Sequence, residues 1–249
     1  VKPVQRFISA WDGLVHEAGD RELSLVVVGA GAAGIELSLS MQYRLQQRVP
    51  QNRMKFAVIT FTEGILPDHN AGVRERMKRV LQARGVAIRT GACVLGWEGA
   101  NLRVEGGEVV RADRVVWATG PAAPRWLSDS GLRTDDQGFV LVDDSLRALS
   151  RPDVFAAGDI ATMVHHPRPK SGVYAVRQGP PLAANLRLAL RGDMPRTFEP
   201  QSRALQLITT GDRNAIASWG PLHAEGSWVW RWKDRIDRRF MRRYAVGQR

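Results

Sequence analysis

The stretch from Leu23 to Met41, LSLVVVGAGAAGIELSLSM, constrains the fold of this chain more than any other. An apolar run leads into a glycine-rich turn and then a helical pattern, which predicts a buried strand, a tight turn and a helix. Gly29, Gly31 and Gly34 fit the spacing G-x-G-x-x-G, which allows a tight turn, close approach of a pyrophosphate and close helix–strand packing. The positive end of the helix dipole also favours a diphosphate. This stretch predicts a dinucleotide site, with an ordinary strand-to-helix turn as the alternative.

Composition and charge set the class of protein. With 249 residues, 44% hydrophobic and 24% charged, the chain has the composition of a globular protein with a substantial core. No apolar run is long enough to cross a bilayer. Cys93 is the single cysteine of the sequence, which favours a reducing compartment, so we expect a cytoplasmic protein. The net charge of +11 indicates anionic partners such as nucleotides, acidic lipid surfaces or nucleic acid.

The order of predicted elements indicates a parallel sheet followed by a meander. Strands are expected at 25–28, 55–61 and 86–90, with helices at 32–47 and 73–84 between them. Residues 92–117 alternate over short stretches and contain Gly106-Gly107, which is typical of an antiparallel meander. Pro121 and Pro124 then mark a linker. Beyond it we expect strands at 139–142, 153–159, 204–209 and 215–218, a helix from Gly179 or Pro180 to Leu190, and a terminal helix.

The terminal helix, residues 228–244, combines an aromatic stripe with a basic surface. Apolar side chains recur at intervals of four residues and so share one helix face: Trp228, Trp232, Ile236, Phe240 and Tyr244. Such a helix can lie in a membrane interface, which would place the protein peripherally on the inner face of the membrane. It can equally pack its stripe on the chain's own sheet. Nucleic-acid binding is not expected, because no recognised nucleic-acid-binding fold surrounds the basic residues.

Three signals follow one another in an informative order: GAGAAGIE at 29–36, VVWATG at 115–120 and DVFAAGD at 153–159. An Asp at a strand end can accept hydrogen bonds from ribose or ribityl hydroxyls at the carboxyl edge of a parallel sheet. With these motifs the chain resembles the pyridine nucleotide-disulfide oxidoreductase superfamily. Its members are flavoproteins with two dinucleotide-binding domains, the NAD(P)H domain being inserted into the FAD domain. The resemblance implies FAD and NAD(P)H as cofactors.

The resemblance also assigns roles to individual residues. The NAD(P)H site would comprise the glycine turn, a glutamate near the nicotinamide and the residue that ends the second strand: Gly29, Ala30, Gly31, Ala33, Gly34, Glu36 and Thr60. The crossover between domains would be lined by Thr119 and Gly120. The flavin would contact Gly158, Asp159, Lys170, Gly172, Val173 and Tyr174, and a helix N-terminus aimed at the ring would stabilise negative charge on reduced flavin. No side chain is assigned a catalytic role.

Within the superfamily, the chain most resembles type II NADH dehydrogenase-like proteins, and more narrowly the reductase module fused to selenide, water dikinase. The segments that carry this narrower likeness are HPRPKSGVYAVRQGPPLAANLR and WRWKDRIDRRFMRRY. The resemblance implies an α/β protein with a leading segment at 1–22 and a Rossmann-like NAD(P)H domain with its meander at 23–121. The C-terminal part of an FAD domain would follow at 122–192, and a small α+β region at 193–249. Without a redox cysteine pair, a quinone or another non-thiol compound is the expected electron acceptor.

The sequence departs from the family's pattern in two places. The family begins with an FAD-binding strand, glycine turn and helix, and this sequence starts where the NAD(P)H insert would begin, so we expect a truncated chain, with a binding module without turnover as the alternative function. At Thr60 the family carries an acidic residue for the adenosine ribose; Glu63 could replace it, whereas Arg53 and Lys55 would favour a 2′-phosphate. No metal site is expected, because the adjacent His165 and His166 cannot easily share one ion.

Overall fold

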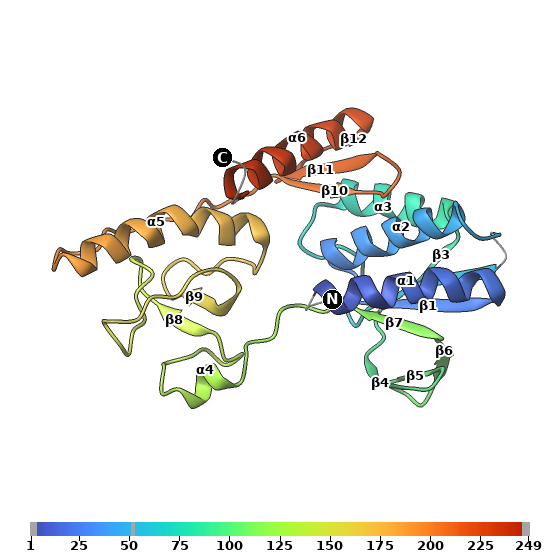
Figure 1. Cartoon of the computed structure of the whole chain (residues 1–249), viewed down its shortest axis with the longest axis horizontal. Coiled ribbons are helices and arrows are strands. Elements are labelled where there is room, and N and C mark those ends of the chain that lie inside the picture. Colours follow the sequence, from blue (N-terminus) through green and yellow to red (C-terminus); the bar gives the residue numbers. More distant parts are fainter. Residues whose placement is uncertain (1–3, 51–52, 246–249) are drawn as a thin grey trace. The chain divides into compact units, whose positions relative to one another are not determined.

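The computed structural model describes residues 4–50 and 53–245 (Figure 1). The chain forms two compact units. The first is built from the chain up to Thr119 together with the part from Leu205 onward, and the second from Gly120 to Ala204. Four segments are expected from the sequence, at 1–22, 23–121, 122–192 and 193–249. That division stays a prediction.

A parallel sheet organises the first unit. β1 (Leu23–Val28), β2 (Met54–Ile59), β3 (Val86–Arg89) and β7 (Arg114–Trp117) lie in the order β3-β2-β1-β7. The apolar run of β1 is buried along nearly its whole length, as expected for a central strand covered on both faces. This arrangement confirms the predicted α/β class.

Helices cover one face of this sheet and the meander covers the other. α1 (Val4–Asp20), α2 (Ala32–Gln46) and α3 (Ala71–Ala83) share a core with Leu25 and Val27 of β1. The neighbouring Val26 and Val28 point to the opposite face, because successive side chains of a strand alternate. There they meet the antiparallel sheet β4 (Val94–Glu98), β5 (Asn101–Val104) and β6 (Val109–Arg111). The expected meander is confirmed.

The last part of the chain returns to the first unit. β10 (Gln206–Thr209), β11 (Ala215–Trp219) and β12 (Leu222–Gly226) form an antiparallel sheet, along which α6 (Ser227–Tyr244) lies (Figure 1). Strand β12 was not predicted. Ile208 and Ile216 join the core that contains α2 and α3, whereas Val229 of α6 packs on the other face. The tight approach is visible at Gly211, where a Cβ atom would lie 2.8 Å from the carbonyl oxygen of Leu39.

The aromatic stripe of α6 does not pack on the chain's own sheet. Val229 is the buried residue of this helix, while the five stripe residues keep 38–57% of their surface exposed. Neighbouring rings of the stripe contact each other: Trp228 stacks on Trp232 at 6.5 Å between centroids, and Phe240 lies 4.8 Å from Tyr244. The docking interpretation of the stripe is therefore wrong. Within the described ranges, no helix is long and apolar enough to span a bilayer.

The second unit is smaller and contains α4 (Trp126–Asp129), β8 (Val140–Val142), a 3-10 turn (Gly158–Ile160), β9 (Ala161–Met163) and α5 (Gly172–Leu190). β8 and β9 pair in parallel. Their buried side chains form a core with Leu127, Leu146 and Ala156.

Two predictions for this unit are wrong. Residues 153–159 do not form a strand: Phe155 makes an isolated bridge to Arg147, and Gly158 adopts a φ of +74°, which ends extended structure and starts the 3-10 turn. The following helix begins at Gly172 rather than at Gly179 or Pro180, and it contains Pro180 and Pro181. Proline at a helix start is common, which suggested the later boundary. Here the carbonyls that the prolines leave unpaired belong to residues 176 and 177, which are exposed and can bind water.

Candidate dinucleotide site

Two of the three motif glycines are required by the backbone itself. Gly29 has a φ of +110°, and a Cβ there would lie 2.5 Å from the carbonyl oxygen of Ala118. A Cβ on Gly34 would overlap the carbonyl oxygen of Gly29. Both glycines stand where β1, β7 and α2 converge, with the Ala118 amide donating to Val28 and the Gly29 amide donating to Ile59, each at 2.8 Å. Their role is to hold this turn together.

Gly31 has a different environment. It is the N-cap residue of α2, with φ −70° and ψ 176°, which any residue can adopt. A Cβ on Gly31 would meet no atom within 4 Å, so the space above it is open. Ala33, in the first turn of the helix, is also exposed, whereas Ala30 is buried. The structure thus leaves room for a pyrophosphate at the positive end of α2, which fits the predicted dinucleotide.

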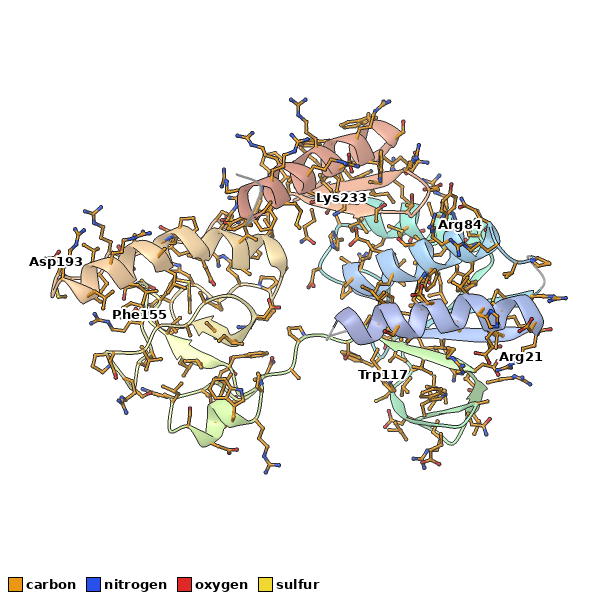
Figure 2. The ribbon with its side chains drawn as sticks, in the orientation of Figure 1. Arg21, Arg84, Trp117, Phe155, Asp193 and Lys233 are labelled. Carbon is orange, nitrogen blue, oxygen red and sulfur yellow. The ribbon has the colours of Figure 1, made fainter. Side chains whose placement is uncertain are left out.

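Glu36 lies farther along α2 and contacts the C-terminal segment. Its carboxylate accepts a hydrogen bond from the Thr209 amide at 2.8 Å and lies 3.7 Å from the Lys233 ammonium of α6. Figure 2 labels Lys233 on α6. Burial raises the pKa of Glu36, and the nearby Lys233 and Thr209 amide lower it in part. The contact of Lys233 with Glu36 was not anticipated from the sequence. The sequence showed only that Lys233 and Asp237 are four residues apart on one helix, and their charged groups lie 3.5 Å apart in the structure.

We expect Lys233→Met to destabilise the protein in a pH-dependent way. A carboxyl with a raised folded-state pKa contributes most stability below its unfolded pKa and loses that contribution as pH rises through the folded pKa. Removing Lys233 enlarges the loss, because the ionised Glu36 then has no cation. The free energy of unfolding should fall by about 1–2 kcal/mol at pH 8 and by much less at pH 4. Urea unfolding at both pH values measures this, and Arg238→Met, which breaks the exposed pair with Asp234, is the control. An equal loss at both pH values would contradict the role of Glu36.

Thr60 follows β2 at the carboxyl edge of the sheet. It is buried, and its Oγ1 lies 2.8 Å from that of Thr62. Arg53 and Lys55 do not approach this edge, because they lie at the beginning of β2. There Arg53 donates to the Gly19 carbonyl and Lys55 pairs with Glu22. The expectation that these two cations favour a 2′-phosphate is therefore wrong.

Thr119 follows β7, is exposed and ends the first unit, whereas Gly120 begins the second. The crossover role of both residues stays a prediction.

The second unit contains a pocket at the N-terminus of α5. Of the predicted flavin residues, four line it: Gly158, Asp159, Lys170 and Tyr174. Gly172 and Val173 belong to the first turn of α5 but do not line the pocket. The Gly158 amide donates to the Gln178 side chain at 2.6 Å, so Gln178 fixes the turn before Asp159. Sequence reasoning missed Gln178, although its place in the helix after the motif was available as a signal.

Lys170 lines this pocket together with a second cation, Arg168. Its ammonium donates to Thr162 Oγ1 at 2.9 Å and to the Ala161 carbonyl, and lies 4.3 Å from the centroid of the Phe139 ring. Burial lowers the pKa of Lys170, while Asp135 and Asp159 raise it. The Ser171 hydroxyl is buried without a partner at the helix start. A cation, a helix N-terminus and an unsatisfied hydroxyl fit part of an anionic cofactor such as FAD. Among the described residues, no cluster of His, Cys, Asp and Glu could hold a metal ion.

Residues 4–179 match the sequence profile of the pyridine nucleotide-disulphide oxidoreductases. The chain belongs to this family. One similar protein is NADH dehydrogenase-like protein Rv1812c of Mycobacterium tuberculosis. It is 32% identical over 151 residues, which cover 55% of this chain and 35% of that protein. Another is the type II NADH:quinone oxidoreductase of Staphylococcus aureus, 24% identical over 74% of this chain and 48% of that protein.

The fold of this family member also matches solved structures. An FAD-dependent pyridine nucleotide-disulphide oxidoreductase from Desulfovibrio vulgaris superimposes with a TM-score of 0.63 and 23% identity, over 84% of this chain and 52% of that one. The chain thus spans about a third to a half of the length of the proteins it resembles.

Proposed function

We propose that this chain carries the NAD(P)H site and part of the FAD site of an NADH dehydrogenase-like oxidoreductase. The open space at Gly31, set between two glycines that the fold needs, is the observation that carries this proposal. Relatives named as NADH dehydrogenase-like and as type II NADH:quinone oxidoreductase support it. Bound flavin would supply hydride acceptance from the dihydronicotinamide and electron delivery to an acceptor.

The residues of the chain would bind and orient the cofactors. The first turn of α2 would hold the pyrophosphate of NAD(P)H, with Gly31 allowing close approach. Glu36, fixed by Thr209 and Lys233, would offer an acceptor to the nicotinamide end of the dinucleotide. In the second unit, Asp159 would accept from hydroxyls of the FAD chain, and Lys170 with the start of α5 would balance negative charge. A quinone or another non-thiol acceptor fits a sequence with a single cysteine.

The remainder of the FAD domain is part of this proposal. Sheets of about four to six strands are the commonest, yet in the described part of the second unit β8 pairs in parallel with β9 alone and otherwise makes isolated antiparallel bridges. The sequence also holds a single G-x-G-x-x-G. A further strand, turn and helix would complete this sheet and hold the adenosine end of FAD. A fused or associated selenide, water dikinase-like domain is the finer proposal, supported by the likeness of residues 165–187 and 230–244. The intact mass of the native protein tests both.

Spectroscopy and calorimetry of the purified protein test the function. A yellow protein with a flavin absorbance band that oxidises NADH is the expected result. A colourless protein that binds NADH in calorimetry without turnover would instead identify a binding module. Failure to bind NADH and NADPH would refute both functions.

The exposed stripe of α6 supports peripheral binding to an anionic membrane. Half-exposed aromatic side chains lie beside Arg231, Arg235, Arg239 and Arg242, a combination that suits the interface of acidic lipids.

We expect the double variant Trp232→Ser and Phe240→Ser to reduce sedimentation with phosphatidylglycerol vesicles by at least threefold, because both rings lose burial in the interface. The control is Leu186→Ser, which removes a comparably exposed apolar side chain from α5. Unchanged sedimentation of the double variant would refute membrane binding through this face.

A further inference from the structure

The loop between β2 and α3 is fastened to the glycine turn at both ends. The Gly29 amide donates to Ile59 at the end of β2, and the Leu66 amide donates to Ala30, each at 2.8 Å. On its other side, the amides of Gly91 and Ala92 donate to Thr62 and Thr60 at 2.9 Å. Residues 60–66 therefore form a fixed rim beside the place where the adenosine half of a dinucleotide would lie.

The threonine hydroxyls of this rim are already committed. Thr62 Oγ1 donates its only proton to the Gly64 carbonyl at 2.8 Å. In the contact between the two hydroxyls, Thr60 must therefore be the donor. Neither hydroxyl retains a proton for a phosphate oxygen.

Glu63 is the charged residue of the rim. It is exposed, and its carboxylate lies near Gly91, 3.7 Å from where a Cβ would stand. Phe61, two residues earlier, is 75% exposed, which is uncommon for so large an apolar side chain. A flat apolar ring beside a carboxylate suits an adenine base and its ribose hydroxyls.

Arg89, which the strand register places next to the rim, is already paired with a carboxylate. Arg89 ends β3 directly beside Ile59, and its carbonyl accepts from the Thr60 amide at 2.9 Å. Both arms of its guanidinium, however, contact the two carboxylate oxygens of Glu108. Arg53 and Lys55 lie at the far end of β2, as described above. The rim thus presents negative charge to an incoming ribose.

We infer that this site selects NADH over NADPH, and that Glu63 is the selecting residue. The inference rests on the proposed nucleotide site and adds its specificity. The Glu63 carboxylate accepts a hydrogen bond from the free 2′-hydroxyl of NADH, and it repels the 2′-phosphate of NADPH, which carries close to two negative charges.

Binding of NADH and NADPH to the wild type, to Glu63→Gln and to Glu22→Gln tests the inference. Calorimetry at low ionic strength gives both dissociation constants. We expect the wild type to bind NADH at least tenfold tighter than NADPH, and Glu63→Gln to reduce this ratio about tenfold, because the amide keeps an acceptor oxygen for the 2′-hydroxyl and no longer repels the 2′-phosphate. Glu22→Gln removes the same charge at the amino end of the strands, where Glu22 pairs with Lys55, and should keep the wild-type ratio.

The outcomes separate the inference from the proposed function. An unchanged ratio in Glu63→Gln, or a wild type that prefers NADPH, overturns the inference and leaves the nucleotide site intact. A wild type that binds neither dinucleotide overturns both.

A second variant acts on Arg89 by removing the charge of its partner. Glu108→Gln releases Arg89 from its two-armed contact and should shift the ratio toward NADPH in the same direction as Glu63→Gln. A shift toward NADH would contradict the electrostatic basis of the selection.

Discussion

Gly31→Val is expected to abolish measurable NADH binding while the free energy of unfolding stays within about 1 kcal/mol of the wild type. A valine at this position meets no protein atom within 4 Å of its Cβ, and the backbone conformation there suits any residue. Its two methyl groups would instead occupy the space of the pyrophosphate. Calorimetry with NADH and urea unfolding of the same preparation measure the two effects.

The matched control for this variant is Gly13→Val in α1. Gly13 also has open space around its Cβ position, and it lies in the same unit on a helix away from the glycine turn. It should leave NADH affinity unchanged. Wild-type affinity in Gly31→Val would refute the assignment of the site.

Gly34→Ala is expected to destabilise the fold itself. It should lower the free energy of unfolding by about 3 kcal/mol or more. Its Cβ would overlap the Gly29 carbonyl oxygen and lie 3.3 Å from the Ala118 Cβ. Neither neighbour can yield easily, because Gly29 and Ala118 are both tied by backbone hydrogen bonds to strand ends. Urea unfolding measures the loss.

The two glycine variants give complementary information. Any loss of NADH binding in Gly34→Ala should follow the loss of folded protein, whereas in Gly31→Val it should occur in folded protein. If Gly34→Ala were as stable as the wild type, the close packing of α2 on the strand ends would be wrong.

The elements predicted well are those whose pattern is local. β1 and α2 follow from one apolar run and one glycine turn, and the alternation of Val26 to Val28 between two cores follows from strand geometry. The motif also indicated that Gly31 faces a ligand, and the open space at Gly31, in contrast to Gly29 and Gly34 beside the end of β7, fits that prediction.

The failures concern interactions between distant segments. Glu36 and Lys233 are separated by nearly the whole chain, so their contact depends on the path of the chain between them. Likewise, the run DVFAAGD at 153–159 predicted a strand, whereas the Gly158 amide donates to the Gln178 side chain and a turn forms there. Pro180 and Pro181 suggested a helix boundary, because proline is common at a helix start. In the structure the helix runs through both prolines, and Tyr174 and Gln178 are buried in the turns that precede them.

The return of the chain from Leu205 to Ala245 to the first unit makes the nucleotide-binding module discontinuous along the sequence. A fragment that stops at Thr119 would expose the side of α2 and α3 that Ile208 and Ile216 cover, and it would leave Glu36 without Thr209 and Lys233. The second unit is thus an insertion in the sequence, between the two segments that build the first unit. Any shortened version meant to retain the glycine-turn site must therefore join both halves.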